Sequence, residues 1–451
     1  MSRMLPLCRL MAALAVVAVA GCTTTVGSSG APSAATASSP ASAVTAPPIS
    51  TPLPTASAGD AWLLVGRTGE PDLKVILDST LEEQIGMPVG VPGEQWGNVF
   101  TTAPGPDSTL VRNVVIQPGY GGDGQTIDGR WALPTIGLDP VPVGLSADRS
   151  TLVLTEADAQ HGAAGADRRT SRFAVLDAYL TSRHAPRIIE LHGAFDFDAL
   201  SPDGSILYVA EQIRGPLEGR YQVRAVDTEN GRLREAVIVD KRNLDEQMAG
   251  YPIDQERRDD GMVLTLYRGA EYPFVHALSS KEAWAVCIDL PTRGFDDTEA
   301  ASDWGITTVG SSELAINATL GIAVEIPMSD LTIGRTVDFE PSAAAPFRLA
   351  KFGHGDLGPA GRRVAPSPDG TSVYAAGAGG IVRLRVGHFE VERRYLSGMA
   401  IQSLAITPDG ATIFALTRTG GRIARVDAET GQVDGCVGDG GFDRLLGALP
   451  W

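Results

Sequence analysis

The sequence predicts an all-β fold, a β-propeller built from repeated four-stranded blades. The main observation is a recurrent turn, Ser/Thr-Pro-Asp-Gly, at residues 201–204, 367–370 and 407–410. An aliphatic residue follows each Asp by four positions, and looser copies of this pattern are centred on Asp107, Asp148, Asp260 and Gly310. Successive copies lie roughly 40 to 59 residues apart, a spacing typical of propeller blades. Seven copies favour seven blades. Six or eight remain open, because the units at 96–139 and 303–340 are degenerate.

Each unit is predicted to contain four antiparallel strands. In the last unit these are residues 402–406, 412–416, 422–427 and 432–437, and the unit that begins at Phe195 has the same order. Pro presets the backbone of the tight turn, and Gly tolerates the left-handed conformation that closes the hairpin. One blade cannot bury both of its faces, so the blades are expected to stack in a closed ring. A β-sandwich with similar hairpins is the alternative.

The turns and the strands after them carry a family resemblance. With Ile206-Leu207-Tyr208-Val209 and Thr412-Ile413-Phe414-Ala415 after the turn, the chain resembles bacterial propellers of the YVTN and WD40-like class. The resemblance covers roughly residues 96 to 440. It implies the propeller fold. That class includes surface proteins, lactonase-like enzymes and assembly scaffolds, so the resemblance assigns no functional residue.

The N-terminus has the pattern of an export signal. Arg3 and Arg9 precede an apolar run at 10–20, which is too short to span a membrane. The run ends in Val19-Ala20-Gly21-Cys22, which resembles a bacterial lipobox. The resemblance implies removal of residues 1–21 as a lipoprotein signal peptide and diacylation of Cys22. Two acyl chains would anchor the protein stably at the extracytoplasmic face of the cell membrane. Ordinary signal cleavage beside an incidental cysteine is the alternative.

Two further regions follow Cys22. Residues 23–59 contain no charged side chain and consist mainly of Thr, Ser, Ala and Pro. Such a composition cannot bury a core, so residues 22–59 are predicted to form a lipidated, disordered tether. Residues 60–451 are predicted to form a single propeller domain.

The charge and the cysteines set further limits. A net charge of −17 with no Lys/Arg cluster argues against a nucleic-acid partner. Cys287 and Cys436 fall in units on opposite sides of a seven-bladed ring, whereas a disulfide needs Cα atoms about 5.5–6 Å apart. Both are therefore expected to be free and buried. A disulfide between them is the alternative, because the predicted export would take the protein to an oxidising compartment.

The search for a catalytic or cofactor motif finds none. HExxH, CxxC, Walker-type and GxSxG patterns are absent, and the histidines have no metal-ligand spacing. Residues 119–124 match GxGxxG, but a dinucleotide site needs a helix directly after the glycines. The residues that follow are typical of strand and turn. No catalytic residue, metal or cofactor is therefore predicted.

The distribution of long loops indicates a binding face. In a blade, the second-to-third and between-blade loops lie on one face of the ring, and here they hold the long insertions, at 158–170, 212–220 and 240–248. Loops on a rigid scaffold commonly carry function. Neutral surface insertions are the alternative. The candidate binding residues on this rim are His161, Arg168, Arg169, Arg214, Glu218, Arg220, Arg242 and Glu246.

Two classes of function remain. The favoured one is a non-enzymatic binding or scaffolding lipoprotein, whose partner is a protein or a cell-wall glycan. The alternative is a propeller hydrolase or lactonase with its site at the central channel. Such an enzyme would need convergent polar groups on the innermost strands. The sequence offers only Asp196 and Asp198 there, and strand alternation allows both to face solvent.

Overall fold

The computed structural model describes residues 60–449, apart from residues 71, 94–96, 117–121, 137–140, 160–164, 181–184, 214–218, 245–247, 270, 294–297, 342–360 and 439. The chain divides into a unit at 1–48 and a unit at 49–451, and all described residues belong to the second. The predicted signal peptide, Cys22 and the predicted tether therefore lie outside the described residues. Within the described part of the chain, no helix has the length and apolar character needed to cross a membrane.

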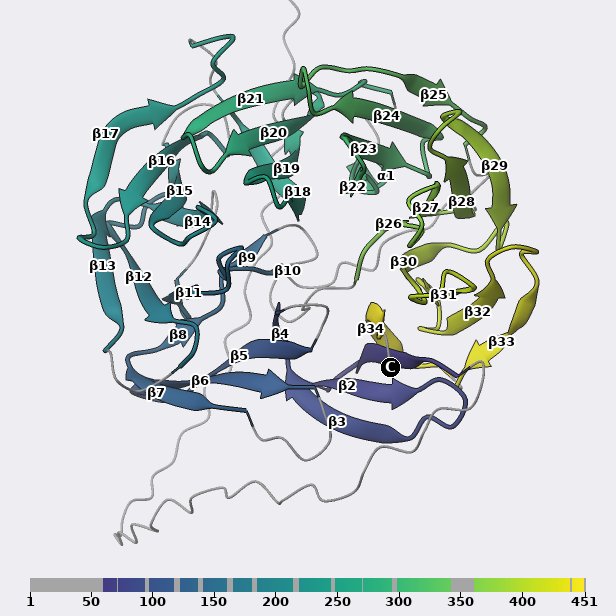
Figure 1. Cartoon of the computed structure of the whole chain (residues 1–451), viewed down its shortest axis with the longest axis horizontal. Helices are drawn as coiled ribbons and strands as arrows, with labels where there is room; N and C mark the ends of the chain where they lie inside the picture. The colour runs from purple at the N-terminus through teal and green to yellow at the C-terminus, as the bar shows by residue number, and fades with distance from the viewer. Residues whose placement is uncertain are drawn as a thin grey trace, which may run out of the picture. The chain divides into compact units, whose positions relative to one another are not determined.

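The described residues form an all-β propeller of eight four-stranded antiparallel blades arranged in a ring (Figure 1). This confirms the predicted fold class, with eight blades in place of the favoured seven. From the innermost strand outward, blade 1 consists of β34 (Phe442–Leu449), β1 (Trp62–Arg67), β2 (Asp72–Leu77) and β3 (Glu83–Pro88). Blade 2 consists of β4 (Gly90–Pro92), β5 (Asn98–Pro104), β6 (Ser108–Val115) and β7 (Gly124–Asp128).

Blade 3 is the irregular one. It consists of β8 (Trp131–Ala132), β11 (Thr151–Glu156), β12 (Thr170–Asp177) and β13 (Arg187–His192). A separate hairpin of β9 (Thr135–Ile136) and β10 (Val141–Pro142) follows the short innermost strand. Blade 4 consists of β14 (Phe195–Leu200), β15 (Ile206–Gln212), β16 (Tyr221–Asp227) and β17 (Leu233–Ile238). These four strands match the predicted order for the unit that begins at Phe195.

The remaining blades run in chain order. Blade 5 consists of β18 (Gly250–Arg257), β19 (Met262–Gly269), β20 (Pro273–Ser279) and β21 (Trp284–Asp289). A single helical turn, α1 (Thr298–Ala301), precedes blade 6, which consists of β22 (Gly305–Val309), β23 (Ser312–Asn317), β24 (Ile322–Pro327) and β25 (Thr336–Asp338). Blade 7 consists of β26 (Val364–Pro366), β27 (Ser372–Gly377), β28 (Gly380–Arg385) and β29 (Glu390–Tyr395). Blade 8 consists of β30 (Ile401–Ile406), β31 (Thr412–Thr417), β32 (Ile423–Asp427) and β33 (Val433–Val437).

The extra blade has a topological cause. In blade 1 the innermost strand β34 and its neighbour β1 come from opposite ends of the domain, and they pair from Trp62 with Leu449 to Arg67 with Phe442. No turn joins them, so this blade cannot carry the turn motif. Asp107 lies in the β5–β6 turn, which joins the second and third strands of blade 2. Five of the other six predicted turns join the first and second strands of blades 4 to 8. The Asp148 turn follows β10 and leads into β11, the second strand of blade 3.

The recurrent turn is stabilised by hydrogen bonds to its Asp side chain. In blade 4, Ser201 Oγ donates to Asp203 Oδ1 over 2.7 Å, and the same Asp oxygen accepts from the amide of Ser205 over 3.1 Å. The hydrogen bond from Ser201 is the main reason that the pKa of Asp203 is lowered. Gly204 has a φ of 69°, the left-handed conformation that the sequence pattern predicts at this position.

The core lies between neighbouring blades. The second strands are apolar on both faces, as in β15, where residues 207–210 are all buried. Outer strands are exposed, and β33 has four successive exposed residues. This gradient arises because an inner strand is covered by both adjacent blades, whereas an outermost strand has one free edge.

The two cysteines differ from the prediction in one respect. Neither is in a disulfide, and Cys287 on β21 is buried as expected. Cys436 is exposed, so the prediction that it is buried was wrong. Cys436 lies on the outermost strand β33 of blade 8, where neighbouring blades cover little of the sheet.

Candidate functional site

The three long loops occupy the positions expected from the sequence. Residues 158–170 join β11 to β12 and residues 212–220 join β15 to β16, so both are second-to-third loops. Residues 240–248 connect blades 4 and 5. Four of the candidate binding residues lie outside the described residues, namely His161, Arg214, Glu218 and Glu246.

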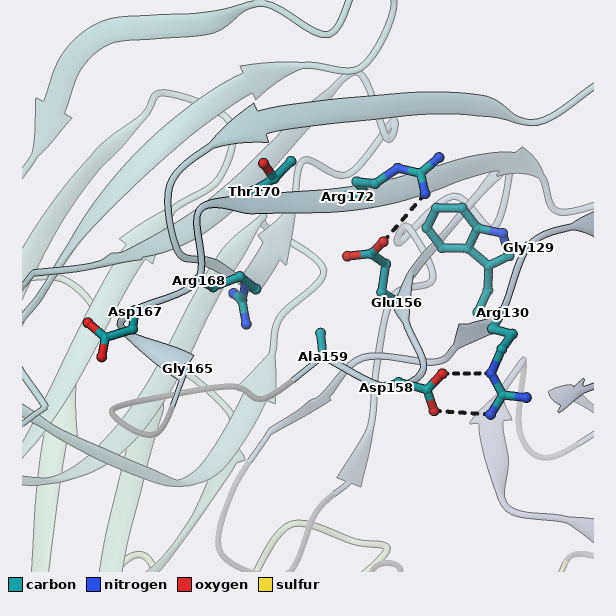
Figure 2. Close-up of a pocket in the computed structure, with 11 residues that line it drawn as sticks. Gly129, Arg130, Glu156, Asp158, Ala159, Gly165, Asp167, Arg168, Thr170 and Arg172 are labelled. Carbon is teal, nitrogen blue, oxygen red and sulfur yellow. Dashed lines mark hydrogen bonds and ion pairs between the residues drawn. The ribbon is translucent and has the colours of Figure 1, made fainter. Parts of the chain in front are cut away.

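A cavity of about 630 Å³ opens beside the first of these loops (Figure 2). Its lining comes from the connection between blades 2 and 3 and from the β11–β12 loop with the strand ends beside it. Six charged residues contribute, three of each sign: Arg130, Arg168, Arg172, Glu156, Asp158 and Asp167. A volume of this size is sufficient for a small ligand or for one side chain of a partner.

One wall of the cavity is an exposed ion pair. Arg130 Nε and Nη2 donate to the two carboxylate oxygens of Asp158 over 2.6 and 3.0 Å. These hydrogen bonds are the main cause of the lowered pKa of Asp158. Asp158 is 68% exposed and Arg130 42%. An exposed ion pair of this kind contributes little to stability because water screens it, so a ligand group can replace either partner at small cost.

A second part of the lining is built on Trp131, the residue after Arg130. Its indole is buried and donates through Nε1 to the carbonyl oxygen of Asp128 over 2.7 Å. The guanidinium carbon of Arg172 lies 5.5 Å from the centre of the Trp131 ring. Arg172 also pairs with Glu156 over 3.4 Å, as Figure 2 shows. The Trp131 part of the lining is therefore fixed by packing, whereas the Arg130–Asp158 pair is exposed.

The main role of Arg168 is to anchor the β11–β12 loop. Its guanidinium donates to the carbonyl oxygen of Phe195 over 2.6 Å and to Asp196 Oδ1 over 2.9 Å. A third hydrogen bond runs from Nε to Ser171 Oγ over 2.9 Å. The Arg168 side chain is only 12% exposed. Its contacts tie the β11–β12 loop of blade 3 to the innermost strand of blade 4.

The other described candidates lie apart from this cavity. Arg169 is exposed, and its carbonyl oxygen accepts from the amide of Gly193. Arg220 forms an isolated bridge with Ala249. Arg242 donates to the carbonyl oxygens of Leu331 and Cys287. The structure thus brings Arg168 to the cavity, with Arg169 next to it in sequence, and does not place Arg220 or Arg242 in its lining.

The innermost strands carry more charge than the sequence analysis recognised. Strand alternation made it possible that Asp198 faces solvent, but its side chain is buried, with 5% exposed. The reason is a β-bulge between Phe197 and Ala199, which breaks the alternation. Burial raises the pKa of Asp198 to about 6, against the opposing effect of Arg257. Burial lowers the pKa of Arg257 to about 10. The Arg257 guanidinium also donates to the carbonyl oxygen of Leu145 in blade 3.

A polar run on β18 was missed altogether. Asp254, Gln255, Glu256, Arg257 and Arg258 are consecutive and all partly buried. The first four lie in β18, and Arg258 follows it directly. Four consecutive polar residues in the innermost strand of a propeller blade depart from the usual apolar composition, and that departure is the signal that could have identified them. Among the described residues, no three His, Cys, Asp or Glu side chains are grouped as metal ligands.

Comparisons with known proteins support the fold. No protein-family model matches the chain, and no curated protein matches its sequence. The structure is similar to apo AztD from Citrobacter koseri, with 13% identity and a TM-score of 0.52 over 86% of this chain and 98% of AztD. It is also similar to dihydro-heme d1 dehydrogenase NirN in its complex with DHE, with 13% identity and a TM-score of 0.51 over 86% of this chain and 74% of NirN. At these identities the likeness concerns the fold alone, and by its fold the chain is an eight-bladed β-propeller.

Proposed function

We propose that the protein is an extracytoplasmic lipoprotein, anchored through Cys22, whose propeller is a non-enzymatic binding or scaffolding module. Its partner is a protein or a glycan of the cell envelope. The rim cavity beside the β11–β12 loop is the observation that supports this function most directly. Its exposed Arg130–Asp158 pair offers a donor fork and a carboxylate that a polar partner group can take over.

In-cell photo-crosslinking tests the binding function. A photoreactive residue replaces Ala159 in the cavity lining, and the matched control replaces Glu229 in the exposed β16–β17 turn on the opposite face. We expect a discrete adduct from position 159 and none from 229. The second change, Asp158→Arg, sets two like charges side by side and should reduce capture by about tenfold. An adduct of equal yield from both faces, or one that is insensitive to Asp158→Arg, would contradict the proposed binding face.

Lipid anchoring is tested separately. Metabolic labelling with an alkyne fatty acid should label the wild type and the Cys436→Ser variant, and Cys22→Ser should lose both the label and membrane association. Retained labelling in Cys22→Ser would exclude the anchor. Failure of this test leaves the crosslinking result standing, because the two experiments probe different parts of the chain.

The second candidate is the propeller hydrolase or lactonase with a site on the ring axis. The observation in its favour is Asp198, whose pKa of about 6 is suited to proton transfer near neutral pH. Hydrolysis of a six-membered lactone that is lost in Asp198→Asn and retained in Asp158→Arg would support this activity. No turnover above buffer by the wild type would exclude it for this substrate class.

A further inference from the structure

A second cavity, of about 330 Å³, lies at the junction of blades 7 and 8, which are neighbours in the ring of Figure 1. Its lining comes from the first-to-second turns of both blades, the third-to-fourth turn of blade 8, and Tyr374 and Arg383 on β27 and β28. These turns lie on the face of the ring opposite the long loops, so we call it the turn-face cavity. Its volume is at the lower end of the range for small-molecule sites, about 300–1,000 Å³.

The hydroxyl of Tyr374 is the unusual group in this cavity. Tyr374 is only 2% exposed, and its ring contacts the ring of Tyr395, 6.0 Å away between centres, and the guanidinium of Arg383, 5.7 Å away. Its hydroxyl makes no hydrogen bond to any residue that the structure describes. The polar tip of a buried tyrosine usually has a hydrogen-bond partner. The Tyr374 hydroxyl is therefore available to a ligand.

The internal repeat shows where this hydroxyl points. Tyr208 of blade 4 occupies the same position, seven residues after the Ser of a Ser-Pro-Asp-Gly turn. Its hydroxyl donates across the blade junction to the carbonyl oxygen of Ser280 over 2.9 Å. The residue of blade 8 equivalent to Ser280 is Ala428, because the amide of each donates to a carbonyl at the end of the first turn of its own blade. Tyr374 is thus directed toward Ala428, which lines the cavity.

The acceptor that Tyr374 would use is already occupied. The carbonyl oxygen of Ala428 accepts from the Tyr395 hydroxyl over 2.8 Å and from Arg383 Nη1 over 3.4 Å. In blade 4 the residue at the position of Arg383 is Ala225, since each is the register partner of the tyrosine on the adjacent strand. Burial raises the pKa of Tyr374 to about 12, so its hydroxyl is neutral at pH 7 and its oxygen can accept a hydrogen bond.

The charges of the lining favour a cation. Its carboxylates outnumber its guanidinium, and the charged residues are Asp369, Asp409, Asp427, Glu429 and Arg383. The guanidinium is balanced from outside the lining, because Arg383 Nε pairs with Glu392 over 3.2 Å. The excess negative charge of the turns is therefore left for a ligand to neutralise.

Two of these carboxylates are held in place and keep one oxygen available. Oδ1 of Asp409 accepts from Thr407 Oγ1 over 2.6 Å and from the amide of Ala411 over 3.0 Å. Oδ1 of Asp427 accepts from the amide and the hydroxyl of Thr430 over 2.6 and 2.7 Å. These hydrogen bonds lower the pKa of both carboxyls, so both are ionised at pH 7. Their Oδ2 atoms make no hydrogen bond within the described part of the chain.

We propose that the turn-face cavity binds a primary alkylammonium group, carried by a free diamine or by a lysine side chain of a partner. An ammonium group has three donors, and the cavity offers three acceptor oxygens, the hydroxyl of Tyr374 and the Oδ2 atoms of Asp409 and Asp427. Hydrogen bonds from a cation to a carboxylate are stronger than those between neutral groups. This site lies on different blades from the rim cavity, and its occupancy does not depend on that cavity.

Isothermal titration calorimetry on the full-length protein tests the proposal with two amine probes, 1,4-diaminobutane and Nα-acetyl-lysine methylamide. The uncharged comparison is 1,4-butanediol, which has hydroxyls in place of the ammonium groups. We expect at least one amine to bind saturably, about tenfold or more tightly than the diol, and more weakly as salt rises. Tighter binding of the diamine would assign the site to a free amine. Equal or tighter binding of the lysine derivative would assign it to a lysine side chain of a partner.

Two tyrosine variants separate binding from folding. Tyr374→Phe removes a hydroxyl without a protein partner, so amine binding should weaken about fivefold and Tm should stay unchanged or rise. Tyr208→Phe removes the equivalent hydroxyl of blade 4, which donates to Ser280. Its Tm should therefore fall by about 1–4 °C, and it should bind the amine as the wild type does.

A second pair of variants tests the carboxylates. Asp409→Asn keeps an acceptor oxygen for its turn and should weaken amine binding about threefold or more. The matched control Asp203→Asn makes the same change in the equivalent turn of blade 4, outside the cavity lining, and should leave amine binding unchanged. Absence of saturable binding by both amines would overturn the proposal. So would diol or calcium binding as tight as that of the amines, or amine binding that Tyr374→Phe leaves unchanged or Tyr208→Phe weakens equally.

Discussion

Replacing Arg168 with Met removes the guanidinium that joins the β11–β12 loop to blade 4. The wild-type group makes hydrogen bonds to Phe195, Asp196 and Ser171, and its side chain and that of Asp196 are 12% and 14% exposed. Removing one partner of a fully buried pair costs about 3–5 kcal/mol. Asp196 retains a 2.9 Å hydrogen bond from Gln212 Nε2 and some contact with water. The expected cost is therefore nearer to about 2 kcal/mol.

That cost translates into a small but measurable change in melting temperature. An unfolding entropy of about 2.1 cal/mol/K per residue over roughly 390 residues gives about 0.8 kcal/mol/K. A loss of about 2 kcal/mol then lowers Tm by about 2–3 °C. Scanning calorimetry of Arg168→Met, Asp196→Asn and the double variant measures their coupling, which should reach about 1 kcal/mol or more. The exposed neighbour Arg169 provides the control, since Arg169→Met should leave Tm unchanged.

Additivity of the two single changes would refute this account of the loop. If Arg168→Met and Asp196→Asn summed to the double variant within about 0.3 kcal/mol, the pair would carry no coupling. The distinction matters for the proposed binding face. A loss of partner capture in an Arg168 variant reflects loop position as well as direct contact, whereas a loss in an Asp158 variant reports on the cavity itself.

Three further predictions concern the axis, the ring closure and the cysteines. Because the folded pKa of Asp198 is raised from 3.8 to about 6, the folded state holds this proton more tightly, and stability is lost as pH rises between those values. The Tm of the wild type relative to Asp198→Asn should therefore fall by about 3 °C from pH 4 to pH 7 in calorimetry, and a constant difference would contradict the burial of this carboxyl. Leu445→Ala empties a fully buried position in the closing strand β34 and should lower Tm by about 3–5 °C; an unchanged Tm would show that this strand contributes little to closure. Iodoacetamide followed by peptide mass spectrometry should modify Cys436 in the native protein and Cys287 only in denaturant, and native modification of Cys287 would contradict its burial.

The recurrent turns were predictable because their determinants are local. Ser201, Asp203 and Gly204 hold their hairpin through bonds within five residues, so the pattern is visible in any linear reading of the chain. The strands of blades 4 and 8 follow from the same turns together with the apolar runs beside them. The absence of a disulfide between Cys287 and Cys436 was also predictable, since the two residues lie in blades that are not neighbours.

The blade count was not predictable from turns, because ring closure is a long-range pairing. β34 and β1 are joined only through hydrogen bonds between the two ends of the domain, and no sequence-local signal marks that pairing. The fate of Asp198 was hidden for a similar reason. A single bulge at residues 197–199 redirects its side chain, and alternation alone gives the opposite orientation.

The sequence by itself determined the repeat, the hairpin chemistry and the face that carries the long loops, because each depends on residues close together in the chain. Only the tertiary structure decided which charged groups meet. Arg130 reaches Asp158 across the junction of blades 2 and 3, and Glu313 comes beside Glu256 across the junction of blades 5 and 6. Both encounters depend on how adjacent blades pack. That packing is set by the whole ring of buried inner strands, and no single segment specifies it.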